Sequence, residues 1–191
     1  MITGIILAGG KSSRLGINKM LLPLAGLPLI DHTISALETA VDRIIVVTGR
    51  FHHELSEHLV SKPDLLVVFN NDYEQGMFTS IKTGVKEVDG NFYVIPGDYP
   101  LVSPETYETL KKESGMIRVP VYYGRRGHPI YFDGSFKNLL LEEPDTSNLK
   151  SFRDRYQVNY VDVFDEGVVF DVDTFQDLEA IEQLMLRRTA N

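Results

Sequence analysis

Short apolar segments alternate with helical patterns through the first half of the chain, and this alternation constrains the fold more than any other feature. Apolar runs of strand length lie at residues 2–7, 43–48, 65–69 and 92–95. Apolar residues at helical spacing fill the intervals at residues 28–41, 52–60 and 77–88. Because parallel strands need long crossovers, the sequence predicts an α/β fold of three layers, with helices on both faces of a mostly parallel sheet.

The second half of the chain has less regular patterns. Further strands are expected at residues 118–122, 129–132, 159–163 and 168–172. A final helix has apolar residues on one face, at Phe175, Leu178, Ile181 and Met185. Either Asp173 or Thr174 can cap its first turn. A length of 191 residues suits one domain, residues 1–191, with a full hydrophobic core.

Composition excludes several classes of function. The formal net charge is -8, so the chain has no general attraction for nucleic acid, and an anionic substrate needs a local site. The chain has no cysteine, which excludes disulfides, thiolate metal sites and cysteine nucleophiles. The first predicted strand starts close to Met1, and no apolar run is long enough to span a bilayer. We therefore expect a soluble cytoplasmic protein without a signal peptide or a membrane partner.

The segment after the first predicted strand has the residue types that bind a polyphosphate. It consists of Leu7, Ala8, Gly9, Gly10, Lys11, Ser12, Ser13, Arg14, Leu15 and Gly16. The consecutive glycines let backbone N–H groups approach a ligand closely, while the hydroxyl and basic side chains, with Lys19 just beyond, add donors and charge. The spacing matches neither a Walker loop nor the G-x-G-x-x-G dinucleotide motif. Its place after an N-terminal strand favours a phosphate site over a tight glycine turn with solvated charges.

One carboxylate stands where a metal would be needed. In open α/β sheets ligands bind beyond the carboxyl ends of the strands, so the loops after the first, third and fourth predicted strands should converge. Asp98 follows the strand at residues 92–95 and would lie at this edge. Mg²⁺ takes one or two carboxylates plus substrate phosphates, which fits Asp98. The alternative is an aspartate that caps the next turn, ahead of Pro100.

The loop after the third predicted strand offers polar groups for a base or a ribose. These are Asn70, Asn71, Asp72, Gly76, Thr79 and Ser80. Gly76 permits close approach, and Thr79 and Ser80 lie near the start of a predicted helix. The same residues also suit a turn followed by a helix cap, so this interpretation stays open.

Short motifs, in order along nearly the whole chain, resemble those of one enzyme family. Residues 7–16, with Lys19 and residues 22–24, resemble the NTP-transferase signature L-A-G/A-G-x-S-x-R-M/L-G-x-x-K. Residues 73–82 resemble the segment after the third strand in molybdenum cofactor cytidylyltransferases. Gly97-Asp98-Tyr99-Pro100 resembles the G-D-x-P metal motif of that family. Two further family motifs are matched by Gly127-His128-Pro129 and by Asp171-Val172-Asp173-Thr174.

The resemblance implies a Rossmann-like nucleotidyltransferase fold and Mg²⁺ dependence. The implied reaction transfers CMP from CTP to the phosphate of molybdopterin and releases pyrophosphate. The NTP would bind to residues 1–100 and the acceptor to residues 101–191. Arg14 would hold the departing β,γ-phosphates, Lys19 would contact the α-phosphate, and Asp98 would bind the metal.

The resemblance also implies the other site residues. The nucleotide-binding set is Leu7, Ala8, Gly9, Gly10, Ser12, Ser13, Arg14, Lys19, Asn70, Asp72, Gly76, Thr79 and Ser80. Acceptor-binding residues would be Gly127, His128 and Pro129. Asp171 and Asp173 alternate along a predicted strand end and would project to opposite sides. We expect Asp171 to be the second metal ligand and Asp173 to cap the last helix.

Alternatives to this function differ in nucleotide, acceptor or chemistry. Leu7-Ala8-Gly9-Gly10 resembles the guanylyltransferase branch, which makes GTP the alternative to CTP. A transferase for a sugar phosphate or a polyol phosphate would share the NTP site but would not typically present Gly127-His128-Pro129. A non-catalytic nucleotide-binding protein would not require Lys19, Asp98 and Asp171 together. A molybdenum enzyme or its chaperone is the protein partner that the family suggests for the product.

Overall fold

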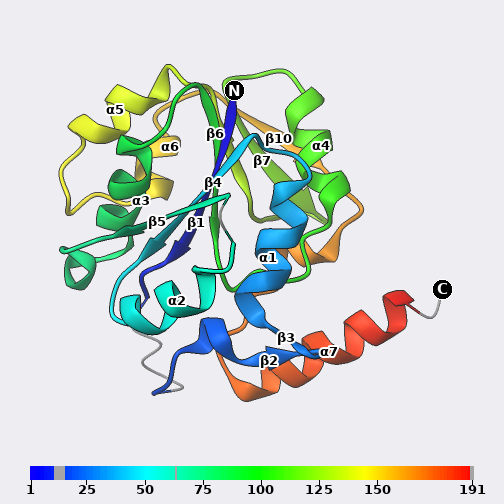
Figure 1. Cartoon of the computed structure of the whole chain (residues 1–191). Coiled ribbons are helices and arrows are strands. Elements are labelled where there is room, and N and C mark those ends of the chain that lie inside the picture. Colours follow the sequence, from blue (N-terminus) through cyan, green and yellow to red (C-terminus); the bar gives the residue numbers. More distant parts are fainter. Residues whose placement is uncertain (11–15, 63, 190–191) are drawn as a thin grey trace.

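A mostly parallel sheet forms the centre of the molecule. The computed structural model describes residues 1–10, 16–62 and 64–189. The strand order is β10-β7-β9-β6-β1-β4-β5, with β8 paired to β7 (Figure 1). The strands are β1 (Ile2–Ala8), β4 (Arg43–Thr48), β5 (Leu65–Phe69), β6 (Asn91–Pro96), β7 (Ile117–Tyr122), β8 (Arg125–Arg126), β9 (Ile130–Phe132) and β10 (Val158–Asp162). Strand β9 is antiparallel to β6 and β7, and β8 is antiparallel to β7, whereas the other pairs are parallel.

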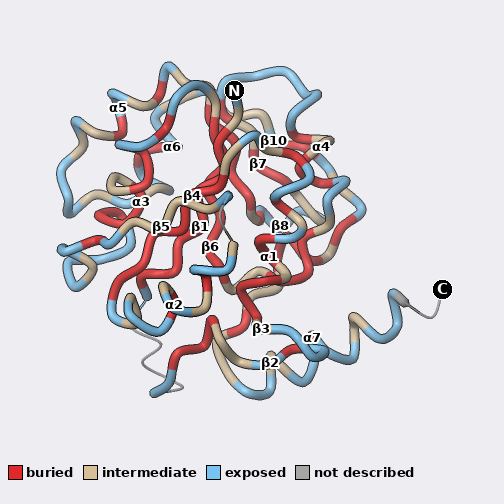
Figure 2. Tube along the Cα trace, viewed as in Figure 1, coloured by how far each residue is buried: buried red, intermediate tan, exposed pale blue. Residues whose placement is uncertain are grey.

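Helices cover both faces of this sheet, which confirms the predicted α/β architecture. One face carries α1 (Leu29–Glu38), α2 (His52–Leu59) and α4 (Pro104–Lys112), and the other carries α3 (Met77–Lys86), α5 (Phe136–Glu142) and α6 (Leu149–Arg153). Successive strand residues face opposite layers: Ile6 packs with the first group and Ile5 with the second. Figure 2 shows the strands as the buried centre. Of the described helices, none is long and apolar enough to cross a membrane.

The order of the strands reverses beside β1 and opens a crevice there. The chain passes from β1 through α1 to β4 and through α2 to β5, all along one face. It then returns along the opposite face through α3 and enters β6, on the other side of β1. The end of β1 is aligned with both neighbours, because Leu7 pairs with Val47 and with Pro96. Such a reversal is where open α/β sheets bind ligands.

The C-terminal helix and a short ribbon form a third apolar cluster beside this crevice. Helix α7 (Phe175–Thr189) packs with Leu24 of β2 (Pro23–Leu24), which pairs with β3 (Leu27–Pro28) to form the ribbon. The buried members of the cluster are Leu24, Leu29, Leu101, Val172 and Ile181. At the far end of α7, the Arg188 guanidinium donates to the carbonyl of Leu101 at 2.7 Å and to Asp165 at 3.1 Å. This packing brings the segments around residues 19 and 173 together.

The predicted strand at residues 168–172 is wrong. The chain instead forms a 3-10 helix, η3 (Glu166–Val169), followed by an irregular segment. Val168 and Val172 are buried, but they contact different loops. The backbone N–H of His128 donates to the carbonyl oxygen of Val168 at 2.9 Å, and the backbone N–H of Val172 donates to the carbonyl oxygen of Asp98 at 3.0 Å. The apolar pattern at residues 168–172 therefore indicates buried side chains, but the backbone of this segment does not pair with a strand. The short elements α4, α5, α6, β2 and β3 were not predicted.

Candidate functional site

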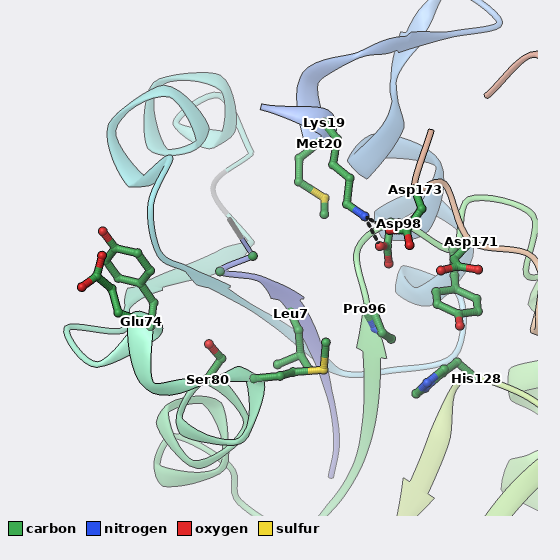
Figure 3. Close-up of a pocket in the computed structure, with 16 residues that line it drawn as sticks. Leu7, Lys19, Met20, Glu74, Ser80, Pro96, Asp98, His128, Asp171 and Asp173 are labelled. Atoms are coloured by element: carbon green, nitrogen blue, oxygen red, sulfur yellow. Dashed lines mark hydrogen bonds and ion pairs between the residues drawn. The ribbon is translucent and has the colours of Figure 1, made fainter. Parts of the chain in front are cut away.

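A cavity of about 570 Å³ opens where β1 and β6 end. Its lining residues come from both halves of the chain: Leu7, Gly9, Gly10, Lys19, Met20, Tyr73, Glu74, Gly76, Met77, Ser80, Pro96, Asp98, Tyr99, His128, Asp171 and Asp173. Figure 3 shows Lys19, Asp98 and Asp173 pointing toward one another at one end, with Ser80 and Glu74 at the other. The convergence expected from the sequence is thus present in the structure. Lys11, Ser12, Ser13 and Arg14 lie outside the described residues.

Just beyond β1, Gly9 and Gly10 line the cavity without side chains. A Cβ atom on Gly9 would lie 2.9 Å from the Ser80 hydroxyl, so this glycine permits β1 and α3 to approach closely. A Cβ on Gly49 would lie 2.5 Å from the carbonyl oxygen of Gly9, which shows that the loop is supported tightly from behind. A Cβ on Gly10 would meet no described atom within 4 Å. Among the described residues, nothing fills the space beside Gly10.

Lys19 is held in place by three acceptors. It begins the 3-10 helix η1 (Lys19–Leu21), whose cap Asn18 accepts from the N–H of Met20 at 3.3 Å and donates to Glu54 of α2 at 3.1 Å. Its Nζ atom donates to Asp98 Oδ2 at 2.5 Å, to the carbonyl oxygen of Val172 at 2.8 Å and to Asp173 Oδ1 at 3.1 Å. Burial lowers the pKa of Lys19, but the charges and hydrogen bonds of the two carboxylates outweigh it and raise the pKa above its ordinary value.

Three carboxylates form a cluster that fits a divalent cation. Carboxylate oxygens of Asp98, Asp171 and Asp173 all lie within 4.8 Å of one another. The Oδ1 atom of Asp98 is buried and has no hydrogen-bond partner among the described residues, which is an oxygen that a cation would satisfy. Burial raises the pKa of Asp98, although the ammonium of Lys19 acts in the opposite direction.

The cap of α7 differs from the expected one, and the metal role of Asp171 stays a prediction. Asp171 and Asp173 both join Asp98, because the segment is not a strand and the rule of opposite projection does not apply. The cap of α7 is made by Thr174, whose hydroxyl accepts from the N–H of Asp177 at 3.2 Å, while the Asp177 carboxylate accepts from the N–H of Thr174 at 2.7 Å. Asp173 contributes its carboxylate to Lys19 and to the acidic cluster.

His128 lines the cavity as a neutral side chain. Burial and the nearby charge of Arg153 lower its pKa to about 4. Its ring meets the ring of Tyr99 edge-on at 4.9 Å, and its Nδ1 atom is buried with no partner among the described residues. Neither Gly127 nor Pro129 lines the cavity, so of the predicted acceptor-binding residues His128 alone reaches it.

Gly127 is required for the loop that carries His128. A Cβ at this position would lie 2.1 Å from the carbonyl oxygen of Val168, the group that accepts from the His128 N–H. We expect Gly127→Ala to lower the free energy of unfolding by roughly 3 kcal/mol, measured by urea denaturation, because backbone must move to admit the methyl group. Gly10→Ala is the matched control and should leave stability unchanged. Equal stability of the two variants would contradict the close packing.

The loop after β5 is held together mainly by its own polar groups. Asn70 is buried and donates to Thr79 at 2.8 Å and to Ser80 at 2.9 Å, and it accepts from the N–H of Asp72 at 3.0 Å. The Thr79 hydroxyl donates to the carbonyl oxygen of Gly76 at 2.8 Å. Of the predicted nucleotide-binding residues in this loop, Gly76 and Ser80 line the cavity, whereas Asn70, Asp72 and Thr79 do not.

Several lining residues were missed by sequence reasoning. Tyr73, Glu74 and Met77 lie within the segment 73–82 that was compared with the family, so a closer reading of that motif would have found them. Tyr99 lies inside the matched G-D-x-P motif. Met20 and the carbonyl group of Val172 carried no linear signal, because only the fold brings them to the site.

Sequence comparison identifies relatives over most of the chain. The family described as "MobA-like NTP transferase domain" matches residues 4–159. A molybdenum cofactor cytidylyltransferase of Escherichia coli is 30% identical over 179 residues, covering 91% of this chain and 91% of the relative. A probable molybdenum cofactor guanylyltransferase of Natranaerobius thermophilus is 26% identical, covering 93% of each chain.

Solved structures share the fold. A nucleotidyl transferase from Methanothermobacter thermautotroptrophicus superposes with a TM-score of 0.83 at 24% identity and covers 98% of this chain and 99% of its own. A protein from Mycobacterium tuberculosis, solved in complex with manganese, has a TM-score of 0.77 at 23% identity and covers 95% of this chain and 98% of its own. At these identities the likeness establishes the fold.

Proposed function

The chain belongs to the family of MobA-like NTP transferase domains and is a nucleotidyltransferase, and on this premise we propose that it transfers CMP from CTP to the phosphate of molybdopterin. In this proposal residues 1–100 hold the nucleotide and residues 101–191 supply the acceptor site. One observation carries it: the bare backbone at Gly10, the ammonium of Lys19 and the carboxylate of Asp98 line the same cavity.

The carboxylate cluster would hold Mg²⁺ in this enzyme. Asp98 and Asp171 are the proposed ligands, and the unpartnered Oδ1 atom of Asp98 supports this assignment. When bound, such an ion would neutralise negative charge on the phosphate groups. The M. tuberculosis protein that contains manganese has the same fold and supports a divalent cation in general.

The protein's own contribution is alignment and charge. The acceptor phosphate oxygen attacks the α-phosphorus of CTP and pyrophosphate leaves, so no protein nucleophile is needed. Backbone N–H groups at Gly9 and Gly10 would face the phosphates, Lys19 would stabilise charge at the α-phosphate, and Arg14 would hold the departing pyrophosphate. His128, which is neutral and lines the cavity, would contact the acceptor without acting as a base.

CTP and GTP are supported by different features. The E. coli relative named as a cytidylyltransferase and the segment 73–82 favour CTP. The N. thermophilus relative named as a guanylyltransferase and the residues Leu7 to Gly10 favour GTP. We take CTP as the proposed substrate because more of the chain agrees with that branch.

The function is tested by measuring pyrophosphate release with molybdopterin, Mg²⁺ and each NTP in turn. We expect release with CTP and a dinucleotide product identified by its mass. If pyrophosphate were released with GTP and not with CTP, GTP would be the nucleotide substrate. Release only when a sugar phosphate or a polyol phosphate replaces molybdopterin would change the acceptor. If CTP raised the melting temperature but no acceptor supported release, the chain would be a nucleotide-binding protein instead.

Gly10→Ala should separate binding from folding. The new methyl group meets no described atom within 4 Å, so we expect an unchanged melting temperature. It would enter the open space beside the backbone and keep the phosphates away, which should weaken CTP binding by about tenfold. Isothermal titration with CTP and Mg²⁺ measures the affinity. Unaltered binding would remove Gly10 from the phosphate site.

Asp171→Ala should lower Mg²⁺-dependent turnover more than Asp173→Ala does. Asp173 is already paired with Lys19 at 3.1 Å, which neutralises part of its charge, whereas Asp98, also paired with Lys19, keeps its unpartnered Oδ1 atom for a cation. Turnover measured across a range of Mg²⁺ concentrations compares the two variants. A loss confined to Asp173→Ala would reverse the assignment of the second ligand.

A further inference from the structure

The ammonium group of Lys19 has no free donor in this structure. Its three N–H groups match its three acceptors, which are Asp98, Asp173 and the carbonyl oxygen of Val172. Only 11% of the side chain is exposed. A phosphate oxygen can therefore be contacted by Lys19 only if at least one of these bonds is broken.

The described wall of the cavity is strongly acidic. Among the lining residues that the structure describes, the carboxylates are Glu74, Asp98, Asp171 and Asp173, and the ammonium is that of Lys19. His128 is neutral, because its pKa is lowered to about 4. Lys19 is thus the cation that balances the acidic cluster on this wall, and it does so by direct contact with two of its three carboxylates.

We propose that Lys19 is an internal counter-cation for the carboxylates, that it competes with the divalent metal in the nucleotide-free enzyme, and that nucleotide phosphates draw it away. Metal and nucleotide then strengthen each other's binding, because the phosphates remove the competitor from the acidic cluster. Such coupling is reciprocal by thermodynamic necessity. The proposal rests on the proposed function in taking the cluster as the metal site and the cavity as the site of the nucleotide phosphates.

The geometry allows this exchange without movement of the backbone. Helix η1 is anchored through Asn18 to Glu54 of α2, so the Lys19 backbone has a fixed position. The lysine side chain is a flexible four-carbon stem with rotatable bonds. Asp173 is the more exposed of the two carboxylate partners, at 41% against 13% for Asp98, so the side chain can leave on that side.

The test measures Mn²⁺ binding to the full chain without nucleotide, by electron paramagnetic resonance of the free ion. We expect Lys19→Met to bind Mn²⁺ about tenfold more tightly than the wild type, because an adjacent positive charge is lost. Lys19→Arg keeps the charge and should stay close to the wild type. Lys82→Met is the matched control, since Lys82 is paired with Asp145 outside the cavity at 2.6 Å. Asp98→Asn should abolish tight Mn²⁺ binding, which would locate the bound ion at the carboxylate cluster.

A second measurement includes a wild-type experiment that does not depend on a folded variant. A non-hydrolysable CTP analogue should raise Mn²⁺ affinity in the wild type, and it should raise it by a smaller factor in Lys19→Met. Unchanged or weaker Mn²⁺ binding in folded Lys19→Met, or no effect of the analogue on the wild type, would overturn the proposal. Failure of pyrophosphate release would instead concern the acceptor and the reaction, because these binding experiments contain no acceptor.

Discussion

Replacing Asp98 with asparagine should lower turnover by about a hundredfold to a thousandfold, the scale observed when one preorganised charged or polar group is lost from an active site. The substitution keeps the shape of the side chain and removes its negative charge. Because the ammonium of Lys19 needs an oxygen opposite it, the amide NH2 group would take the place of the buried, unpartnered Oδ1 atom that we assign to the metal. Turnover is measured as pyrophosphate release from CTP with molybdopterin and Mg²⁺.

The control for this variant is Asp145→Asn. Asp145 also accepts from a lysine, Lys82, at 2.6 Å, but it lies on the surface away from the cavity. Exposed ion pairs of this kind contribute little, so this variant should keep the wild-type rate. Asp98→Asn with an unchanged melting temperature and more than half of the wild-type rate would remove Asp98 from the reaction.

Replacing Lys19 with methionine should lower turnover by about a hundredfold or more. The ammonium would stabilise charge at the α-phosphate, and methionine preserves the apolar stem but not that charge. The loss of rate should accompany tighter Mn²⁺ binding, so rate and metal affinity move in opposite directions. A variant that had merely lost its fold would lose both its turnover and its Mn²⁺ binding.

Lys82→Met serves as the control for the loss of a paired lysine, and it should change neither turnover nor Mn²⁺ affinity. The comparison is informative because both lysines donate to carboxylate groups and to a backbone carbonyl group: Lys82 to one carboxylate and Lys19 to two. If Lys19→Met and Lys82→Met had the same small effect on turnover, Lys19 would be a structural lysine only.

Much of the fold was accessible from the sequence because burial leaves a local periodic pattern. Strands β4 and β5 have the predicted bounds, β1 is one residue longer than predicted at one end, and β6 is one residue longer at each end. The carboxyl ends of parallel strands meet at one edge, so the topology brought Gly9, Gly10 and Asp98 to a common cavity as expected. The pattern failed at residues 168–172, where valines are buried by loops and not by neighbouring strands.

The contacts within the site could not be read from the chain. Lys19 bonds to Asp98 across 79 positions and to Asp173 across 154 positions. The carbonyl oxygen of Val172 accepts from Lys19 as well, and any residue could supply such a backbone group. Asp173 was expected to be a helix cap because aspartate suits that task, yet the structure gives the cap to Thr174.

The amino-acid sequence therefore determined the layers, the succession of strands β1, β4, β5 and β6, and the presence of a glycine loop and an acidic residue at the same sheet edge. These features depend on residue types at short spacing, and short spacing is what a linear pattern records. The tertiary structure alone decided that both Asp171 and Asp173 join Asp98, and that Lys19 is held by carboxylates with no donor left over. Those arrangements follow from the packing of α7 and the β2–β3 ribbon beside the crevice, and packing between distant segments leaves no period in the sequence.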